Sequence, residues 1–317
     1  MMDGDDVVFY FNELLVPCQQ VLIGLHEANI VVRKRRIDVF NRLEHVAWFT
    51  EVSPNGELPV MQVGGGETVI GLEKCLYWIA GQMQEGSKKN FISSSGEQKK
   101  MKSFSKINDC LEELTFAICL HPKNATVSVI RWPFCEPALR ESVRSYPVRA
   151  SGFLEKYGQE NSKMANFGEL VRAESLFEKY LENDACQKYV SVLREEIKAL
   201  LLPFEELLAD DSRVGIWLDG LQFSAHDCMF SAILVRLYQL GLEEDLWEAG
   251  NLPHVTFYAR EAFNRPSVLK VTKWKENENM VQKIDLEPPE NKAARYAMYA
   301  ALGLAGAYVF KKVFKSS

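Results

Sequence analysis

Residues 217–227 read Trp-Leu-Asp-Gly-Leu-Gln-Phe-Ser-Ala-His-Asp, and they form the most informative run in the chain. Ser224 and Asp227, three residues apart, predict a capping box, in which each side chain accepts a hydrogen bond from the other residue's backbone amide. Phe223 and Cys228 flank the box and predict a hydrophobic staple. We therefore expect a core helix to begin here, with Ser224 and Asp227 stabilising the fold and taking no part in chemistry.

The chain around this run predicts an all-helical domain at residues 101–285. Strand signals are sparse there, and apolar side chains recur at helical spacing, as at Leu193, Ile197 and Leu200. Residues 133–210 are interpreted as an insertion, because its first part is charged, rich in turn residues and weakly periodic. Residues 85–100 are polar and include Ser93-Ser94-Ser95-Gly96, which predicts an interdomain linker.

Residues 1–84 alternate between strand-like and helix-like patterns. The alternation predicts a small α/β domain with a mixed sheet, in the order strand, helix, strand, helical crossover, two strands and helix. The predicted segments are a strand at Val7–Phe11, a helix after Pro17, a strand from Ile30 into Arg33–Arg36, a hairpin of Leu58–Val63 with Thr68–Ile70, and a helix from Leu72.

The composition restricts what the chain can bind. Of its 317 residues, 37 are Lys or Arg and 43 are Asp or Glu, which gives a net charge of −6. This net negative charge disfavours nucleic acid as a partner, because proteins bind nucleic acids largely by neutralising phosphates with Lys and Arg side chains. The seven cysteines contain no Cys-x-x-Cys pair and the five histidines are scattered, so we expect neither a metal site nor a cofactor. The acidic start, Met1–Asp6, resembles neither a signal peptide nor a presequence, which favours reduced thiols in the cytosol.

A thioredoxin-like domain, a linker and a helical domain in this order resemble the glutathione transferases. Leu58-Pro59 resembles their buried cis-proline turn, in which the residue before proline offers its backbone to the cysteinyl unit of glutathione. A trans-proline that opens a strand is the simpler interpretation of this dipeptide alone. Further runs narrow the resemblance to the ganglioside-induced differentiation-associated protein 1 family; they are Ile118–Pro122, Trp217–Ser224, Leu240-Gly241 and Leu252–Tyr258.

The predicted glutathione cleft departs from the transferases at both of its polar anchors. The resemblance places Leu15 at the position of a hydroxyl that stabilises the glutathione thiolate in one class, and Val16 at the thiol position of another. Neither side chain donates a hydrogen bond. Leu72 and Glu73 stand where the γ-glutamyl carboxylate would be bound at a helix start, and Glu73 would repel that anion.

We therefore expect a degenerate cleft that binds glutathione weakly or not at all, and no catalytic residue. Its expected lining is Leu15, Leu58, Pro59, Leu72 and Glu73. Cys18 lies one turn further along the first helix and is the alternative thiol. Tyr10 lies in the first strand and is expected in the core.

Arg33-Lys34-Arg35-Arg36 permits two interpretations. A charged edge strand discourages pairing with other sheets, which is the simpler one. The alternative is contact with anionic phospholipid headgroups.

Residues 290–317 predict a membrane tail anchor. Tyr296 to Phe310 contains no charge, and Arg295, Lys311 and Lys312 flank it as snorkelling residues would. A segment that is apolar on all sides favours a membrane helix over a buried terminal helix, which remains the alternative. Small residues four apart, such as Ala297 and Ala301, would allow two such helices to pack as a homodimer; the alternative is that these alanines face lipid.

The resemblance implies a tail-anchored protein of the outer mitochondrial membrane whose body faces the cytosol. It also implies a role in mitochondrial network dynamics, especially fission, and in redox homeostasis. Peroxisomal targeting is the alternative location. Two other functions stay open: a membrane-tethered glutathione transferase that uses Cys18, and a soluble glutathione-transferase-like binding module.

Overall fold

The computed structural model describes residues 7–41, 43–92, 97–121, 129–131, 133–145, 183–248, 250–272 and 281–283. The chain divides into a compact unit at residues 1–284 and a second unit at residues 285–317, and all described residues lie in the first. The predicted tail anchor, with Arg295, Tyr296, Phe310, Lys311 and Lys312, lies outside the described residues. Within the described ranges, no helix combines the length and apolar character that crossing a membrane requires.

The first part of the chain forms the predicted mixed sheet, with strand order β2-β1-β3-β4. β1 runs parallel to β2 and antiparallel to β3, and β3 pairs antiparallel with β4. Three glycines at Gly64–Gly66 make the turn between β3 and β4. The strands span Val8–Phe11 (β1), Arg33–Arg36 (β2), Val60–Val63 (β3) and Glu67–Ile70 (β4).

The second strand lies later in the chain than predicted. β2 consists of the basic run alone, and its ladder begins where the Arg33 amide donates to the Val7 carbonyl at 2.9 Å. The residues before it close the preceding helix instead. Asn29 adopts a left-handed conformation, with φ of 54°, and the Ile30 amide donates to the Leu25 carbonyl at 2.9 Å. This helix-capping turn uses residues that the apolar pattern assigned to the strand.

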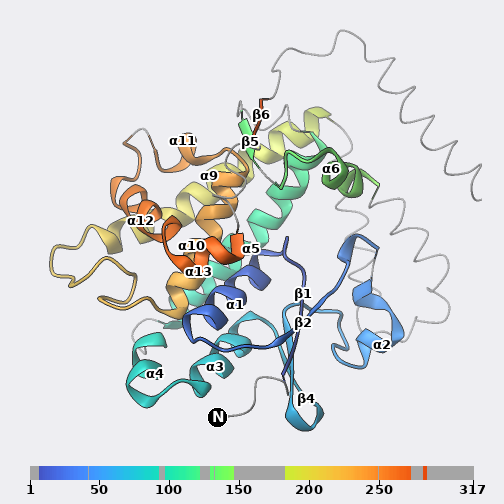
Figure 1. Cartoon of the computed structure of the whole chain (residues 1–317). Helices are drawn as coiled ribbons and strands as arrows, with labels where there is room; N and C mark the ends of the chain where they lie inside the picture. Colours follow the sequence, from blue (N-terminus) through green and yellow to red (C-terminus); the bar gives the residue numbers. More distant parts are fainter. Residues whose placement is uncertain are drawn as a thin grey trace, which may run out of the picture. The chain divides into compact units, whose positions relative to one another are not determined.

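Helices cover both faces of the sheet (Figure 1). α1 (Val16–Glu27) and α3 (Leu72–Gln82) pack together on one face. α2 (Ala47–Thr50) lies on the other face and closes a small separate core. Tyr10 belongs to this small core and is 4% exposed, which agrees with the prediction that it is a core residue. The fully buried members of this core are Ile37, Phe49 and Val60.

The stretch predicted as a linker, residues 85–100, contains helical structure. α4 spans Glu85–Phe91, and α5 already begins at Glu97. Phe91 explains the first of these helices, because its ring is 2% exposed and joins the main core. One buried aromatic residue thus fixes a segment whose other side chains are polar.

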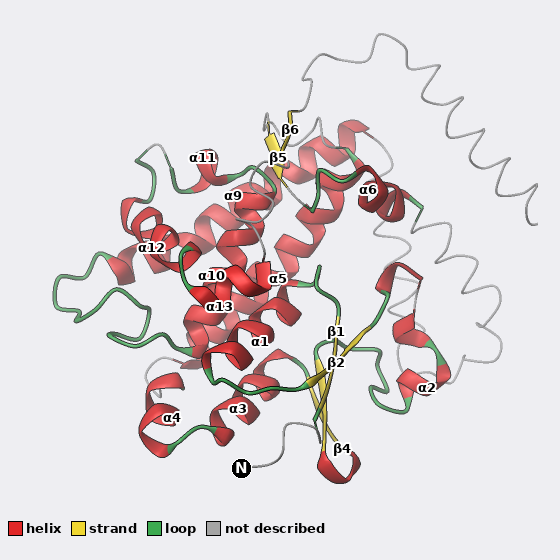
Figure 2. Ribbon diagram, viewed as in Figure 1, coloured by secondary structure: helices red, strands yellow, loops and turns green. Residues whose placement is uncertain are grey.

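The later part of the chain is a helical layer built around α5 and α10 (Figure 2). α5 packs against α9, and α10 packs against both α5 and α1. α10 is buried along nearly its whole length, from Ala225 onward. The helices span Glu97–Leu120 (α5), Pro137–Arg144 (α6), Asn183–Leu208 (α9), Ala225–Gln239 (α10), Glu243–Leu246 (α11), Pro253–Phe263 (α12) and Pro266–Thr272 (α13).

The capping box at the start of α10 has the predicted geometry. The Asp227 carboxylate accepts from the Ser224 amide at 2.8 Å, and the Ser224 hydroxyl accepts from the Asp227 amide at 3.4 Å. Asp227 is fully buried and also accepts from the Leu218 amide and the Tyr258 hydroxyl, each at 2.8 Å. The box therefore joins α10 to the loop before it and to α12.

One feature differs from the all-helical domain predicted for residues 101–285, and another differs from the insertion interpreted at residues 133–210. β5 (Val129–Arg131) pairs antiparallel with β6 (Val281–Lys283) and forms a small second sheet. The stretch interpreted as an insertion, 133–210, contains α9, whose Val190, Ile197 and Leu201 are fully buried in the main core. Residues 146–182, also within that stretch, lie outside the described residues.

Candidate functional site: a cleft beside the first helix

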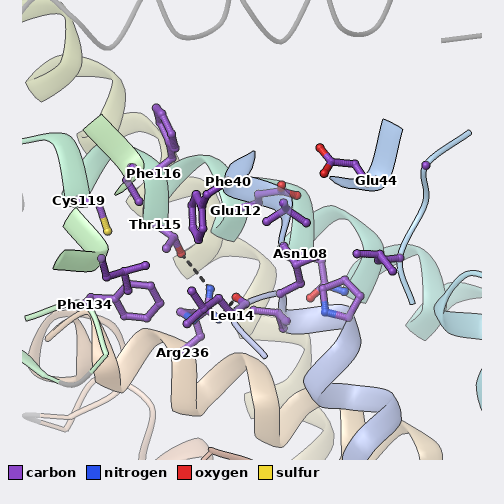
Figure 3. A pocket seen from close by; sticks show the side chains of 18 residues that line it. Leu14, Phe40, Glu44, Asn108, Glu112, Thr115, Phe116, Cys119, Phe134 and Arg236 are labelled. Carbon is purple, nitrogen blue, oxygen red and sulfur yellow. Dashed lines mark hydrogen bonds between the residues drawn. The ribbon is translucent and has the colours of Figure 1, made fainter. Parts of the chain in front are cut away.

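A cavity of about 360 Å³ opens between the start of α1, the cis-proline loop and helices α5, α6 and α10. Figure 3 shows its side chains, which come from segments far apart in the sequence. A volume of this size is at the lower end of small-molecule sites. Most of the lining is apolar, and it includes Leu15, Val16, Phe40, Leu58, Phe116 and Phe134.

The Leu58–Pro59 peptide bond is cis, as the resemblance implied. The turn is tied to the start of α3, because the Gly71 amide donates to the Pro59 carbonyl at 2.9 Å. Leu58 lines the cavity as predicted, whereas Pro59 does not, and Val60 continues directly into β3. The cis-proline turn that the resemblance implied is thus present at this edge of the cavity.

The turn between β1 and α1 brings Leu15 and Val16 to the cavity. Asn12 holds this turn, because its side-chain amide donates to the Ile37 carbonyl at 2.8 Å and its oxygen accepts from the Leu14 amide at 2.9 Å. Leu15 occupies the N-cap of α1 and provides no side-chain cap. Both residues therefore contribute hydrocarbon where thiolate chemistry needs a donor.

Cys18, the alternative thiol, is fully buried on α1. Burial raises its pKa far above the usual range, and a hydrogen bond from the backbone of Asn12 opposes the shift only in part. A thiolate is the reactive form of cysteine, so this environment favours an inert side chain. Cys18 is also absent from the residues that line the cavity.

Leu72 and Glu73 begin α3, as predicted, but they do not line the cavity. Leu72 is half-buried, Glu73 is exposed, and the N-cap is Gly71 with φ of 93°, which offers no side-chain cap. The helix start therefore presents a carboxylate in its first turn and no hydroxyl or amide side chain.

Three charged residues line the cavity and were not predicted from the sequence: Arg236, Glu112 and Glu44. Arg236 is 3% exposed; its Nη2 donates to the Leu14 carbonyl and its Nη1 to the Thr115 hydroxyl at 3.4 Å (Figure 3). Its guanidinium also lies 4.7 Å from the ring centroid of Phe134. Burial lowers the pKa of Arg236 to about 10, so it remains a cation near neutral pH.

Glu112 lines the cavity from α5; its side chain is exposed to solvent, while many protein atoms lie around its carboxyl group. Burial raises the pKa of Glu112, the neighbouring Asp109 adds to the shift, and Arg236 opposes it. Glu112 lies on α5 and Arg236 on α10, and the sequence patterns of these segments predict only amphipathic helices. Only the packing of α10 beneath α1 shows that Arg236 faces a cavity.

A second polar cluster lies at the start of α10. Asp219 accepts from Lys100 and contacts His226 Nδ1, each at 2.6 Å, and the side chains of Asp219 and His226 are each 4% exposed. Burial alone would raise the pKa of Asp219, but hydrogen bonding to His226 and Lys100 holds it well below the usual range. This cluster ties α5 to the loop before α10.

Across the described part of the chain, no group of three or more His, Cys, Asp or Glu side chains is placed to hold a metal ion.

Comparison with curated proteins identifies two relatives. The human protein named ganglioside-induced differentiation-associated protein 1-like 1 is 21% identical over 281 residues, which cover 84% of this chain and 74% of that protein. Its mouse counterpart is 21% identical over 266 residues, covering 80% and 69%. No family model matches the chain.

Solved structures share the fold at low identity. Beta-etherase LigF from Sphingobium has a TM-score of 0.56 at 12% identity and covers 84% of this chain and 99% of its own. A glutathione transferase family member from Pseudomonas fluorescens, solved with two glutathione bound, has a TM-score of 0.53 at 14% identity and covers 86% and 94%. Glutathione transferase F2 from Populus trichocarpa has the same score and identity and covers 85% and 99%. The chain is therefore a glutathione-transferase-like protein related to the ganglioside-induced differentiation-associated protein 1-like proteins.

Proposed function

We propose that this protein is a non-catalytic glutathione-transferase-like protein, anchored in the outer mitochondrial membrane by residues 290–317. In this proposal the body faces the cytosol, either alone or as a homodimer, and acts in mitochondrial network dynamics, including fission, and in redox homeostasis. The relationship to the ganglioside-induced differentiation-associated protein 1-like proteins supports the class of function. The chemistry of the cleft supports the non-catalytic part.

The start of α1 carries the argument against catalysis. A glutathione transferase lowers the pKa of the bound thiol by donating a hydrogen bond to the thiolate. Leu15 and Val16 have no donor, and Cys18 is fully buried with a raised pKa. The first turn of α3 carries the carboxylate of Glu73, outside the cavity lining, and would repel a γ-glutamyl carboxylate that approached this helix start.

Calorimetry with reduced glutathione tests this part directly. We expect weak or no binding at millimolar glutathione, and weak or no conjugation of a generic electrophile such as 1-chloro-2,4-dinitrobenzene. The double variant Leu15→Ser/Glu73→Gln, which restores one donor and removes one charge, should increase glutathione affinity. Tight binding by the unmodified chain would contradict the proposal, and turnover that Cys18→Ala abolishes would establish the enzyme instead.

The uncharged run from Tyr296 to Phe310 supports the anchor, together with the basic residues Arg295, Lys311 and Lys312 on its flanks. Imaging of a tagged full chain, and of a chain that ends at residue 289, tests it. We expect mitochondrial outer-membrane labelling that survives alkaline carbonate, and its loss on truncation. Peroxisomal labelling would correct the location, and full extraction by carbonate would favour a soluble binding module.

A further inference from the structure

The edge strand β2 concentrates positive charge on an otherwise acidic protein. Arg33, Lys34, Arg35 and Arg36 are all exposed, and β2 ends the sheet on that side among the described strands (Figure 1). At about 3.3 Å per residue they line up over roughly 10 Å. The whole chain has a net charge of −6, so this strand differs in sign from the average surface.

Among the residues that the structure describes, three of these four cations have no acidic partner. Arg36 pairs with Glu13, with Nε 2.8 Å from the carboxylate. In the described part of the chain, no carboxylate lies within ion-pair distance of Arg33, Lys34 or Arg35. Their charge is therefore available to an outside anion.

Apolar side chains accompany these cations. The Arg35 guanidinium lies 4.1 Å from the ring centroid of Trp48, which is 38% exposed on α2. Val31, two residues before the strand, is 78% exposed. Cations beside an exposed tryptophan and an aliphatic side chain match the composition of surfaces that rest in the headgroup region of a bilayer.

We propose that β2 and its neighbours, Val31, Arg33–Arg36 and Trp48, form a docking surface for a bilayer that contains anionic phospholipids. Long cations project from both faces of the strand, since Arg33 and Arg35 align with Val8 and Tyr10 while Lys34 and Arg36 align with Phe9 and Phe11. Charged side chains along an edge strand discourage the pairing of an added strand. A headgroup layer requires no pairing with the backbone, so it fits the surface better.

The test uses the full chain with Val31→Cys labelled by an environment-sensitive maleimide dye. All seven native cysteines are buried, so the label selects position 31. We expect stronger, blue-shifted emission on vesicles containing phosphatidylserine than on pure phosphatidylcholine, and quenching by nitroxide-labelled lipid. The response should diminish between about 0.1 M and 1 M salt, because the screening length shrinks from about 10 Å to 3 Å.

The triple variant Arg33→Gln/Lys34→Gln/Arg35→Gln separates this surface from other charges. Each basic residue near an anionic bilayer strengthens binding about fivefold, so the variant should lower the ratio of docked to undocked protein about a hundredfold. Lys74→Gln/Lys102→Gln/Lys188→Gln removes the same charge from other exposed positions and should leave the ratio unchanged.

Three outcomes would overturn this proposal: equal emission on both lipids, a response that survives the β2 variant, and saturation by polyglutamate in preference to vesicles. The last would assign the strand to an acidic protein segment. Flotation of the same samples after carbonate washing reports the tail anchor separately. A failed anchor and a failed docking surface therefore give different results.

Discussion

Every cysteine side chain in this protein is buried, and Cys18 and Cys75, on the two helices beside the sheet, are among the four that are fully buried. Burial raises the pKa of both thiols, that of Cys75 to about 12. We predict that Ellman's reagent titrates close to no thiol in the native protein near pH 8 and all seven after denaturation. Fast labelling of one thiol that disappears in Cys18→Ser would contradict this prediction and revive the enzymatic alternative.

Asp219 gives a prediction about acid stability. Its pKa in the folded protein is lowered by His226 and Lys100 against the opposing effect of burial, so the unfolded chain takes up its proton first as the pH falls. The stabilisation is present above pH about 4 and is lost at lower pH. Urea denaturation between pH 6 and pH 3 should therefore show a shallower loss of unfolding free energy for Asp219→Asn than for the wild type. Asp211→Asn, at an exposed site, is the control, and an unchanged slope in Asp219→Asn would refute the assignment.

The cis-proline and the capping box could be predicted because each depends on residues close in sequence. Leu58-Pro59 and Ser224 with Asp227 fix their own backbone geometry through local contacts. Arg236 and Glu112 could not be predicted as cavity residues, because a helical pattern does not show which partner helix each face meets. Their role depends on the packing of α1 across α5 and α10.

At the scale of elements, α1 is joined to α5 and α10 by a buried amide pair. Gln20 Nε2 donates to Asn108 Oδ1 at 3.2 Å and to the Met229 carbonyl at 3.1 Å, and Asn108 Nδ2 donates back to Gln20 Oε1 at 3.1 Å. Both side chains are buried, so neither can exchange its partner for water freely.

Substitution of this pair should show strong coupling. Gln20→Leu or Asn108→Leu alone should each cost about 2 kcal/mol of unfolding free energy, because a buried amide loses its partner. The double variant should cost at least about 1 kcal/mol less than the sum, since the second substitution removes a group already left without a partner. Chemical denaturation measures both effects. Gln20→Leu combined with the exposed Gln222→Ala should be additive, and additivity in the buried pair would contradict this account.

The elements themselves were predictable where the pattern was periodic and less so where capping or pairing intervened. The first strand, α1, the β3–β4 hairpin and α3 follow from local patterns. The start of β2 was misplaced, because the capping turn at Asn29 uses the apolar residues before it. β5 and β6 are three residues each and lie about 150 residues apart, so no local signal identifies their pairing.

At the scale of the whole compact unit, α1 belongs to two layers: the layer of the four-stranded sheet with its helices, and the helical layer built around α5 and α10. It packs on α3 and also on α10 and α13. At its end, Glu27 accepts two hydrogen bonds from Arg265, at 2.7 and 2.6 Å, and a third from Ser267. The two layers therefore share one helix and a bidentate ion pair, in addition to a continuous core.

This sharing predicts that the two layers unfold together. Calorimetry should show one heat-capacity peak, and tryptophan fluorescence and far-ultraviolet circular dichroism should give the same midpoint. Glu27→Gln should lower the stability by about 2 kcal/mol and shift both signals equally. Two resolved peaks, or a variant that moves only one signal, would show that the layers are independent.

The small β5–β6 sheet has a mechanical consequence. β6 ends at Lys283, and the second unit begins at Asp285. A force applied to the residues after β6 therefore acts on the compact unit through the pairing of β6 with β5. On the opposite strand, Arg131 donates to the Tyr238 carbonyl at 2.6 Å and pairs with Glu243. Tension from the carboxyl-terminal side is thus passed to the end of α10, the same helix that places Arg236 beside the cavity.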